Sequence, residues 1–597
     1  MLALLVIVPL VVAAFLAVIL RSRTTLVRYV ALGASVISLL IAVALLLTSS
    51  NMVQQFIWFN VGQYAVHIST TTAPINLMLL LIVAGITPLI FAYSIGYLKT
   101  PSEQGRYYFE MCIFAASMML FSISANFISL FIAWEMLGIT SYLLIGFWQY
   151  KPKAQLAARK AITTIIIGDV AMLIAMLLIW STYHTFEFLA LYSAAATPAL
   201  YAAMLLIAVA AFTKSAQFPF TEWLADAMEG PTPVSAFLHS STMVKAGVFL
   251  ILILAPIYTN LHILNLFVIF GIVSALVGAM NALAEHHIKR ILAYSTIEDL
   301  ALMFIAIGFN ALYAAVLLFI VQAFYKALLF MSAGSIMTAG DDEEDLFESF
   351  NSTKNRGLFI TMVIGTLSLA GIFPMSGFFG KAAIDSVAAN FSSLPNIILY
   401  VLLSVVDLLS SIYIFRWLFV PMRKAPLEKA FTLNINYRTL PKSMLIPPTI
   451  LAAFVIIGSV FYVTLTNLLP LGGLPVSIGV SDTVVETILV LAGLAIAYLL
   501  YVKMRLSGFT EKHEVLRGAF NSGAEINVLY NYFAAFVMLS ANVVWRFDHY
   551  IDRLLYYSGM GLVEIGNRLR RLQNGQTNLY VAAFMLGLLA LILLFAL

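Results

Sequence analysis

The stretch AFTKSAQFPF at residues 211–220 ends a long apolar run with a cation and a helix breaker. Lys214 lies in a segment that otherwise has the composition of a membrane-spanning helix. Pro219, five residues later, has no backbone N–H and interrupts any α-helix at this point. We expect the carbonyl groups freed by the break to be left for water. The stretch therefore predicts a broken helix with a lysine at membrane depth.

The composition of the whole chain agrees with a membrane setting. Of its 597 residues, 62% are hydrophobic and 10% are charged, whereas about a quarter are charged in a typical soluble protein. Apolar runs of about twenty residues, each long enough to cross a bilayer as a helix, exclude a β-barrel, whose strands alternate over about ten residues. We predict an all-α polytopic membrane protein with about sixteen spanning helices, near 1–20, 27–48, 73–97, 108–124, 127–148, 160–180, 197–215, 234–256, 262–284, 291–309, 311–336, 358–387, 396–419, 444–468, 484–502 and 577–597.

Lysine and arginine residues gather in alternate loops, which predicts the orientation. Such loops remain in the cytoplasm, so both termini are expected outside. Residues 525–573 have two interpretations: the first part could cross the membrane, or the whole segment could lie along the cytoplasmic surface as an amphipathic helix. The second interpretation keeps its five arginines on the basic side. The basic loop residues are Arg21, Arg23, Arg28, Lys99, Arg106, Lys151, Lys153, Arg159, Lys160, Lys289, Arg290, Lys354, Arg356, Arg423, Lys424, Lys429, Arg438, Lys442, Lys503, Arg505, Lys512 and Arg517.

Eleven titratable residues remain at membrane depth. A charge there costs several kcal/mol unless it is paired or faces water. They could be structural ion pairs, but apolar packing serves stability better, so the set as a whole predicts a proton or ion path. Arg416, near the end of its span, is expected to snorkel to the surface. The eleven are Glu135, Asp169, Lys214, His239, Lys245, Glu298, Asp299, Lys326, Lys381, Asp385 and Asp407.

A second interruption occurs in LSLAGIFPMSGFFGK, residues 367–381, where Pro374 precedes Lys381 by seven residues. By the predicted orientation, the two interrupted spans run in opposite directions. Broken helices at matching places in opposite directions are typical of inverted repeats with an ion site at the midplane. The alternative is a coincidental pair of proline kinks.

Redox and metal chemistry are not expected in this chain. Cys112 is the one cysteine, which excludes an internal disulfide and a cysteine-ligated iron–sulfur cluster. No dinucleotide fingerprint or phosphate-binding loop occurs. The acidic run GDDEEDLFESF (340–350) is most simply a solvated loop. We therefore expect no cofactor and no metal here.

Five motifs resemble the antiporter-like subunits of respiratory complex I and the large subunits of multisubunit cation/proton antiporters. The similarity covers roughly residues 70–420. The motifs are SLFIAWEMLGITSYLLIGFW (129–148), AFTKSAQFPFTEWLADAMEGPTPVSAFLHSSTMVKAGVFL (211–250), IKRILAYST (288–296), AFYKALLFMSAGS (323–335) and GIFPMSGFFGK (371–381).

Within this superfamily the chain most resembles the L-subunit family, called subunit 5 in mitochondria. Asp169 in IGDVAMLI and the C-terminal LRRLQNGQTNLY carry that resemblance. It favours a lateral helix over a crossing at 525–573. The implied domains are N-terminal transmembrane helices at 1–105, antiporter-like repeats at 106–256 and 257–420, additional transmembrane helices at 421–524, the lateral helix at 525–574 and a final transmembrane helix at 575–597.

The resemblance also implies roles for individual residues. Glu135 and Lys214 would be the first-half pair, Lys326 the central lysine and Lys381 the lysine near the outward exit. Residues that would support the proton path are Asp169, His239, Lys245, Glu298, Asp299 and Asp385.

The chain departs from the family pattern at three places. Gln322 stands where a histidine is common, Glu298-Asp299 replaces Ser-Gln, and the acid normally directly after Lys381 is absent, Asp385 being the nearest. Our hypothesis is that Glu298 or Asp299 supplies a titratable step in place of the histidine.

The function implied is a proton-translocating membrane-arm subunit of an NADH (or analogous donor)–quinone oxidoreductase. Quinone, flavin and iron–sulfur clusters would lie in partner subunits. The neighbours would be other antiporter-like subunits and the lipid bilayer, in a prokaryotic plasma membrane or the mitochondrial inner membrane. The alternatives are the large subunit of a Na⁺/H⁺ antiporter, which Lys245 favours slightly, and a structural clamp built on the lateral helix.

Overall fold

The computed structural model describes most of the chain and divides it into two units, Met1–Glu514 and Val515–Leu597. The lateral helix and the final span predicted in the second unit lie almost wholly outside the described residues and stay predictions. The described residues are 2–48, 52–62, 64–98, 103–340, 343–349, 355–389, 394–423, 439–458, 480–503, 550, 553, 557, 560, 564 and 584–586.

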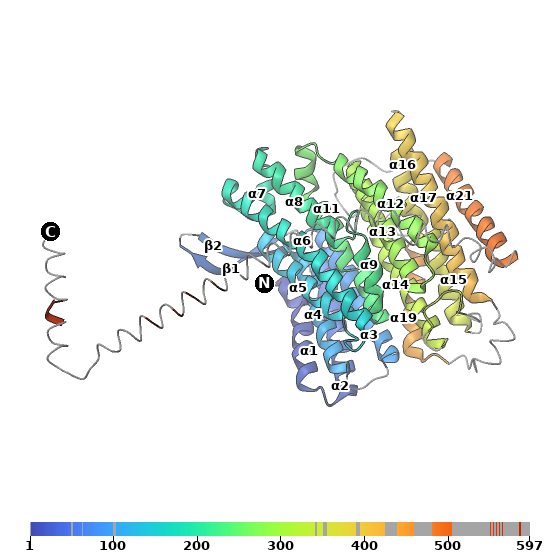
Figure 1. Ribbon diagram of the computed structural model, residues 1–597, viewed down its shortest axis with the longest axis horizontal. Coiled ribbons are helices and arrows are strands. Elements are labelled where there is room, and N and C mark those ends of the chain that lie inside the picture. Colours follow the sequence, from blue (N-terminus) through green and yellow to red (C-terminus); the bar gives the residue numbers. More distant parts are fainter. Residues whose placement is uncertain are drawn as a thin grey trace. The chain divides into compact units, whose positions relative to one another are not determined.

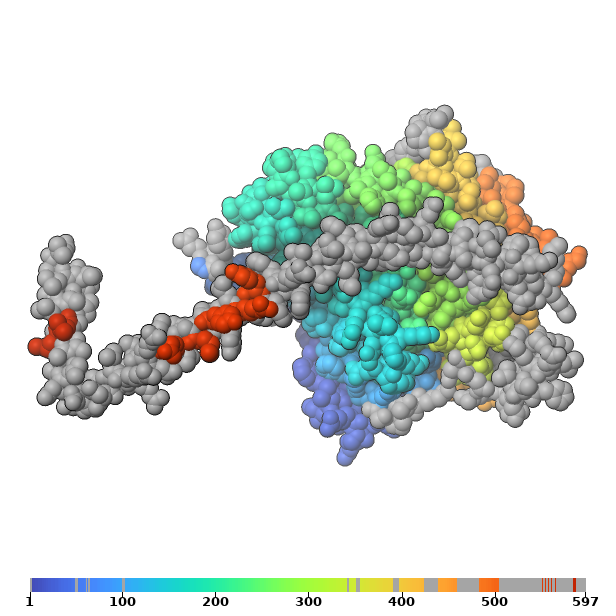
Figure 2. Space-filling model, in the orientation of Figure 1, coloured from blue at the N-terminus to red at the C-terminus, as the bar shows by residue number. Residues whose placement is uncertain are grey.

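The first unit is a bundle of helices, with the N-terminal helices α1 and α2 at one side and α16, α17 and α21 at the other (Figure 1). The space-filling view shows the same progression from blue to orange across the surface (Figure 2). Its first part contains η1 Leu2–Val6, α1 Val8–Ile19, α2 Thr24–Thr48, β1 Val53–Val61, β2 Tyr64–Thr71, α3 Pro74–Tyr97, α4 Gln104–Ile123, α5 Phe127–Ile145, α6 Pro152–Tyr183, α7 Phe188–Tyr192 and α8 Pro198–Lys214.

The second part of the unit continues from α9 to η6. Its elements are α9 Glu222–Asp226, η3 Ala227–Glu229, α10 Thr232–Ser240, α11 Met243–Asn260, α12 Asn265–Ala284, α13 Ile288–Gly308, α14 Leu312–Ala339, α15 Arg356–Ala370, α16 Ser376–Ala389, α17 Leu394–Phe419, η5 Val420–Met422, α19 Lys442–Ile457, α21 Val480–Tyr498 and η6 Leu499–Lys503.

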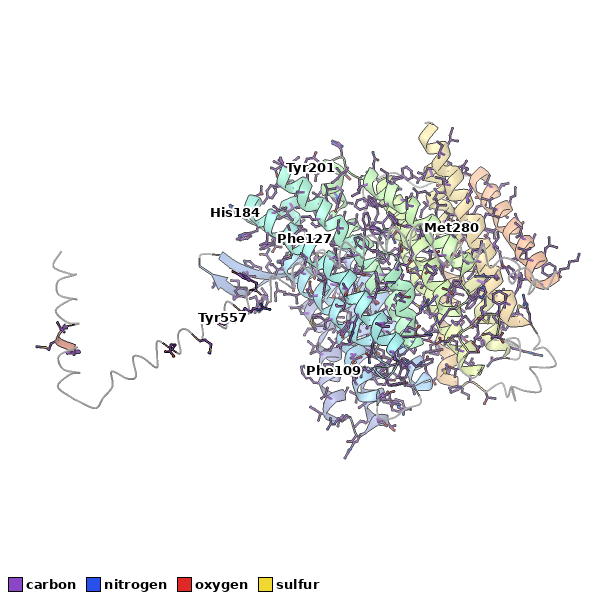
Figure 3. All side chains as sticks on the ribbon, in the orientation of Figure 1. Phe109, Phe127, His184, Tyr201, Met280 and Tyr557 are labelled. Carbon is purple, nitrogen blue, oxygen red and sulfur yellow. The ribbon has the colours of Figure 1, made fainter. Side chains whose placement is uncertain are left out.

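The helical fold predicted from the sequence is confirmed. Among the described residues, 10 helices are long and apolar enough to cross a membrane, and four shorter apolar helices accompany them. Every predicted span up to residue 502 overlaps a helix, while the count of sixteen stays a prediction. Side chains fill the space between the ribbons (Figure 3). Several helices begin at a polar side chain that accepts a backbone N–H, as Asn126, Thr197 and Asn355 do.

The connection between the predicted spans 27–48 and 73–97 contains a β-hairpin, which the sequence did not predict. Strands β1 and β2 pair antiparallel, and Gly62 turns between them with a φ of 60°. The strands are rich in aromatic and β-branched residues, which favour extended backbone. Phe56, Ile57 and Trp58 in β1 are all exposed. Consecutive exposed apolar residues do not alternate, so this strand lacks the period-2 pattern by which a strand is usually recognised.

The helix predicted to break at Pro219 ends at Lys214. Side chains donate hydrogen bonds to backbone carbonyls next to the break. The indole of Trp223 donates to the Thr213 carbonyl at 3.0 Å, and the Gln217 amide donates to the Ser215 carbonyl at 2.9 Å. The expectation that these carbonyls would be left for water is therefore wrong for these two. Protein donors satisfy them because the break is enclosed by the bundle.

The second break separates α15 from α16 and is also confirmed. Gly371 ends α15 with a φ of +79°, a conformation that favours glycine. Gly377, in the first turn of α16, lies so close to α15 that a Cβ there would be 1.8 Å from the Ser368 carbonyl oxygen. The two half-helices are thus packed directly against each other.

Arg416 does not snorkel, contrary to the expectation. Its side chain is buried, and its guanidinium donates to the carbonyls of Ala282, Leu283 and Glu285 at the C-terminal end of α12. Those carbonyls have no partner within the helix, and a cation is favourable at this end of the helix dipole. Arg416 therefore fixes α17 to the turn between α12 and α13.

The acidic run is also more ordered than a solvated loop. The Ile288 N–H donates to the Glu344 carbonyl and the Leu346 N–H to the His286 carbonyl, both at 2.9 Å. The imidazole of His287 lies 3.1 Å from the Glu344 carboxylate. This hydrogen bond, helped by the charge of Lys289, lowers the pKa of Glu344 to about 2. The carboxylate is thus charged at neutral pH and holds residues 343–349 against the α12–α13 turn.

Candidate functional site

Almost all of the titratable residues predicted at membrane depth are enclosed by the bundle. Lys214, Lys245 and Lys326 are fully buried and Lys381 is 2% exposed. Glu298, Asp299 and His239 are fully buried as well. Glu135 differs, because it is only partly buried. Burial of so many ionisable groups is costly unless they are paired, so their partners decide what they can do.

In the first half, Lys214 at the end of α8 lies between α5 and α6. Its Nζ is 3.5 Å from Asp169 Oδ1 and donates to the Trp134 carbonyl at 3.0 Å. The Trp134 indole donates to the same Asp169 oxygen at 2.7 Å. We call Trp134, Asp169 and Lys214 the first-half cluster.

The close partner of Lys214 is therefore Asp169 and not the predicted Glu135. Glu135 lies on the same helix as Trp134 and is close enough to interact electrostatically with both Asp169 and Lys214. The sequence could not distinguish the two acids, because the choice depends on how α5 and α6 are rotated about their axes.

Between the two halves lie Lys245 and His239. Ser215, next to Lys214, donates to the Val244 carbonyl at 2.7 Å, so the end of α8 contacts the start of α11 beside Lys245. The Lys245 ammonium donates to the Phe319 carbonyl and lies 4.5 Å above the Phe319 ring. His239 is buried, and neither ring nitrogen has a hydrogen-bond partner among the described residues.

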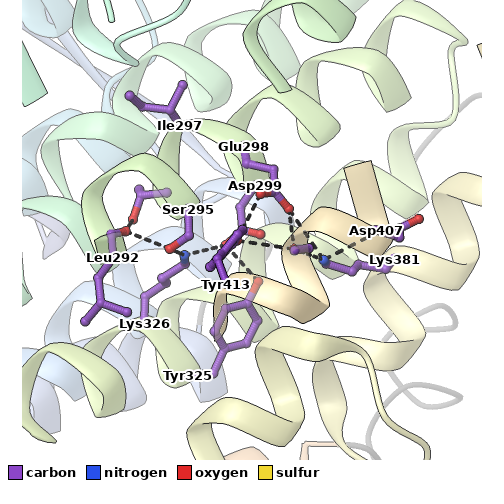
Figure 4. A network of polar contacts seen from close by, with 12 residues as sticks. Leu292, Ser295, Ile297, Glu298, Asp299, Tyr325, Lys326, Lys381, Asp407 and Tyr413 are labelled. Atoms are coloured by element: carbon purple, nitrogen blue, oxygen red, sulfur yellow. Dashed lines mark hydrogen bonds and ion pairs between the residues drawn. The ribbon is translucent and has the colours of Figure 1, made fainter. Parts of the chain in front are cut away.

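The second half contains a larger polar network around Lys326 (Figure 4). Lys326 Nζ on α14 is 3.1 Å from Asp299 Oδ2 on α13 and donates to the Ser295 hydroxyl. Tyr325 donates to the same Asp299 oxygen at 2.9 Å. The central lysine thus has a carboxylate partner from the neighbouring helix.

Glu298, the residue before Asp299, carries the network onward to α16 and α17 (Figure 4). Its Oε1 lies 3.6 Å from Lys381 Nζ, and its Oε2 accepts from Tyr413 at 2.9 Å. Ser410 donates to Glu298 and also accepts from Lys381 at 3.0 Å. Lys381 Nζ is 3.6 Å from Asp407 Oδ1. We call Ser295, Glu298, Asp299, Tyr325, Lys326, Lys381, Asp407, Ser410 and Tyr413 the second-half cluster.

The adjacent acids of α13 therefore lie between the central and the exit lysine, where the sequence hypothesis needs them. Asp299 is paired with Lys326, and Glu298 is paired with Lys381. Adjacent residues on a helix point about 100° apart, so one helix can serve two neighbours. Gln322, where the family commonly has histidine, is buried, and neither side-chain amide atom has a partner among the described residues. That α13 supplies a titratable step in place of the histidine stays a prediction.

Sequence reasoning missed several members of these clusters. Asp407 was recognised at membrane depth but given no role, although it is a direct partner of Lys381. Asp385, expected to support the proton path, is buried on α16 one turn after Lys381. Trp134, Ser410 and Tyr413 gave no signal of their own, since hydroxyl and indole groups are ordinary in membrane helices. Their roles depend on contacts between distant segments.

Chemically, each of the two clusters pairs buried ammonium groups with carboxylate groups at short distances. Such groups can exchange protons, because burial disfavours a charged ammonium whereas a nearby carboxylate favours it. The balance between the two effects decides whether the lysine keeps its proton. Among the described residues, no group of three His, Cys, Asp or Glu side chains could hold a metal ion. The pairs of ammonium and carboxylate groups are suited to proton transfer between side chains.

Comparison with known proteins gives consistent matches. The family model described as "NADH:quinone oxidoreductase/Mrp antiporter, TM" matches residues 124–407. A second, described as "NADH-Ubiquinone oxidoreductase (complex I), chain 5 N-terminus", matches residues 58–109. Both clusters lie within the first match except for Ser410 and Tyr413, which follow it closely.

Two similar proteins are both named NADH-quinone oxidoreductase subunit L. NADH-quinone oxidoreductase subunit L of Mycobacterium tuberculosis (strain ATCC 25618 / H37Rv) is 37% identical over 348 residues, which are 56% of this chain and 54% of the relative. The chain thus spans about half the length of this relative. The Escherichia coli (strain K12) subunit L is 33% identical over 424 residues, covering 69% of this chain and 68% of the relative.

A solved structure has the same fold. A chain of the Mrp complex from Dietzia sp. DQ12-45-1b superposes with a TM-score of 0.75 at 24% identity, covering 100% of this chain and 63% of that one. This likeness concerns the fold alone, while the sequence matches distinguish among the proteins that share it. On these matches, the chain belongs to the NADH-quinone oxidoreductase subunit L family.

Proposed function

We propose that this chain is a proton-translocating membrane-arm subunit of an NADH (or analogous donor)–quinone oxidoreductase. The observation that carries the proposal is the second-half cluster, in which Lys326 and Lys381 are bridged by Asp299 and Glu298. Electron transfer in partner subunits, which would hold the quinone, flavin and iron–sulfur clusters, drives the proton movement.

In this proposal a proton is loaded at Lys214 from the cytoplasmic side. Asp169 and Glu135 alternate as its partner and so raise or lower its proton affinity. Lys245 and His239 connect the first-half cluster to Lys326. Asp299 and Glu298 carry the proton on to Lys381, which releases it outward.

The surroundings of the chain follow from the same proposal. It lies in a prokaryotic plasma membrane or the mitochondrial inner membrane with both termini outside, as the basic loops indicate. Its neighbours are other antiporter-like subunits of the complex. The two inverted repeats at 106–256 and 257–420 are supported by the two helix breaks, one at 215–221 and one at 371–375.

The experiment is Lys214→Ala in the assembled complex in native membranes. We expect redox-driven proton uptake into inverted vesicles to fall by about tenfold or more, because removing a positioned proton-transfer group typically costs 10²–10⁴-fold. Lys153→Ala, which removes an exposed cation near the start of α6, is the matched control and should leave uptake unchanged. Undiminished uptake in an assembled Lys214→Ala complex overturns the proposal.

A second candidate is the large subunit of a Na⁺/H⁺ antiporter without redox coupling. The shared fold of the Mrp complex chain and the buried Lys245 favour it. The same Lys214→Ala membranes distinguish the two functions. Loss of Na⁺/H⁺ exchange with quinone reduction and its pumping untouched supports the antiporter, whereas loss of redox-driven pumping supports the oxidoreductase subunit.

A further inference from the structure

A carboxylate outside both clusters lies against the second one. Glu486 is on α21, in the apolar segment TVVETILVLAG, and its side chain is 3% exposed. Neither carboxylate oxygen has a hydrogen-bond partner among the described residues. An unpaired buried carboxyl destabilises a fold by several kcal/mol. Stability therefore does not explain a glutamate at this position.

The carboxylate of Glu486 points at the break between α15 and α16. A Cβ at Gly371 would lie 2.8 Å from Glu486 Oε1 and 3.6 Å from Lys381 Cδ. The charged groups that face Glu486 are Lys381 and Asp385 of α16 and Asp407 of α17, each close enough to interact with it electrostatically. Glu486 thus joins Glu298 and Asp407 as a third carboxyl beside the exit lysine.

The level of Glu486 along the bundle follows from how α21 packs on α17. Gly493 contacts Ser411, and Tyr498 stacks edge-on against Phe419, so the two helices run in the same direction. Glu486, seven residues before Gly493, therefore lies near the middle of α17 and slightly toward its N-terminal end from Asp407. Asp385, one turn beyond Lys381, lies toward that end too.

We propose that Glu486 is a further proton-transfer residue, which accepts the proton that leaves Lys381 and passes it toward the α16–α17 end of the bundle. The Lys381 ammonium loses a proton to the Asp407 carboxylate 3.6 Å away, and the Glu486 carboxylate then takes that proton from Asp407 and becomes a neutral carboxylic acid. Each step moves one proton and no electrons.

This inference rests on the proposed function and gives the exit path a group that lies outside the five quoted motifs. By this inference, α21 takes part in proton transfer as well as packing against α17. The acid absent after Lys381 is then replaced by three carboxyls from three helices.

The test is Glu486→Gln in the assembled complex, with Glu486→Asp and Thr487→Val beside it. Glutamine keeps the shape but cannot carry the proton. We expect redox-driven proton uptake to fall to less than a third in Glu486→Gln, with assembly intact. The Asp variant should retain most of the uptake and shift its pH profile. Thr487→Val, an exposed neighbour on the same helix, should behave as the wild type.

Each outcome decides the assignment. Normal uptake in Glu486→Gln overturns it, and so do equal losses in the Gln and Asp variants accompanied by poor assembly, which indicate a structural residue. If Lys214→Ala abolishes uptake while Glu486→Gln retains it, the assignment alone fails. If Lys214→Ala also pumps normally, the proposed function fails and the assignment fails with it.

Discussion

At the scale of single residues, the buried lysines with close carboxylate partners differ in how many they have. Lys214 has Asp169, Lys326 has Asp299, and Lys381 has both Glu298 and Asp407. Removing one partner of a buried pair leaves an uncompensated charge, at a cost of about 3–5 kcal/mol. The lysine can avoid that cost by releasing its proton. A change in a carboxylate therefore alters proton affinity before it alters the fold.

Asp299→Asn should reduce redox-driven proton uptake by about tenfold or more, because Lys326 loses its one carboxylate partner among the described residues and keeps only the Ser295 hydroxyl. The measurement is proton uptake into inverted vesicles at equal complex content. Ser295→Ala is the comparison, since it removes a hydroxyl and leaves the ion pair. It should lower uptake less than Asp299→Asn does, and the reverse order would contradict the assignment.

Glu298→Gln should have a smaller effect than Asp299→Asn, because Lys381 retains Asp407 at 3.6 Å. Replacing both acids by the usual Ser-Gln of the family should slow pumping at least as strongly as Asp299→Asn alone. Proton uptake and quinone reduction are measured on the same membranes. Full activity in the double replacement would show that α13 supplies no titratable step.

At the scale of elements, the sequence was sufficient to predict the helices but not to predict which side chains of neighbouring helices contact each other. Long apolar runs and two prolines predict both broken helices, because lipid leaves a segment few alternatives to helical structure. The hairpin was missed because Phe56, Ile57 and Trp58 do not alternate with polar residues. The partner of Lys214 was assigned to Glu135 by resemblance, whereas the structure brings Asp169 closest. Such pairings depend on helix rotation, which one sequence does not encode locally.

The close contact between α6 and α8 offers a test of whether the pairing of Lys214 depends on the position of these helices. A Cβ at Gly168 would lie 1.9 Å from Thr213 Oγ1, so Gly168→Ala must push α6 away from α8. Asp169 and Lys214 are the next residues on those helices, and their pair should lengthen. We expect proton uptake to fall several-fold with a loss of stability of about 1–3 kcal/mol, the usual cost of overpacking.

The matched control is Gly85→Ala in α3, where a Cβ meets nothing within 4 Å. It adds the same methyl group to a membrane helix without moving a neighbour. Thermal unfolding of the purified complex and proton uptake are compared for the two variants. Equal behaviour of the two would mean that the α6–α8 spacing does not matter for Lys214.

At the scale of the whole molecule, the two broken helices hold the lysines at the two ends of the proposed path. Lys214 ends the helix before the first break, and Lys381 follows the second break by two turns. Between them in the sequence lie α11, α13 and α14, which carry the buried charges of Lys245, Glu298, Asp299 and Lys326. Arg416 and the segment 343–349 fix the α12–α13 turn, and so the position of the helix that carries Glu298 and Asp299. The fold thus positions one helix, α13, between Lys326 and Lys381.

If the two halves form one path, their terminal lysines should not act independently. Lys214→Ala and Lys381→Ala should each lower redox-driven proton uptake, and the double variant should be no worse than the more severe single one. Residues acting as one unit give strongly non-additive effects, whereas distant independent sites add in free energy within about 0.3–0.5 kcal/mol. The measurement is the proton uptake of the four complexes at equal assembly, with Lys153→Ala added to each as a neutral background change. Multiplied losses in the double variant would mean that each half moves its own proton, and the bridge of Glu298 and Asp299 would then serve the second half alone.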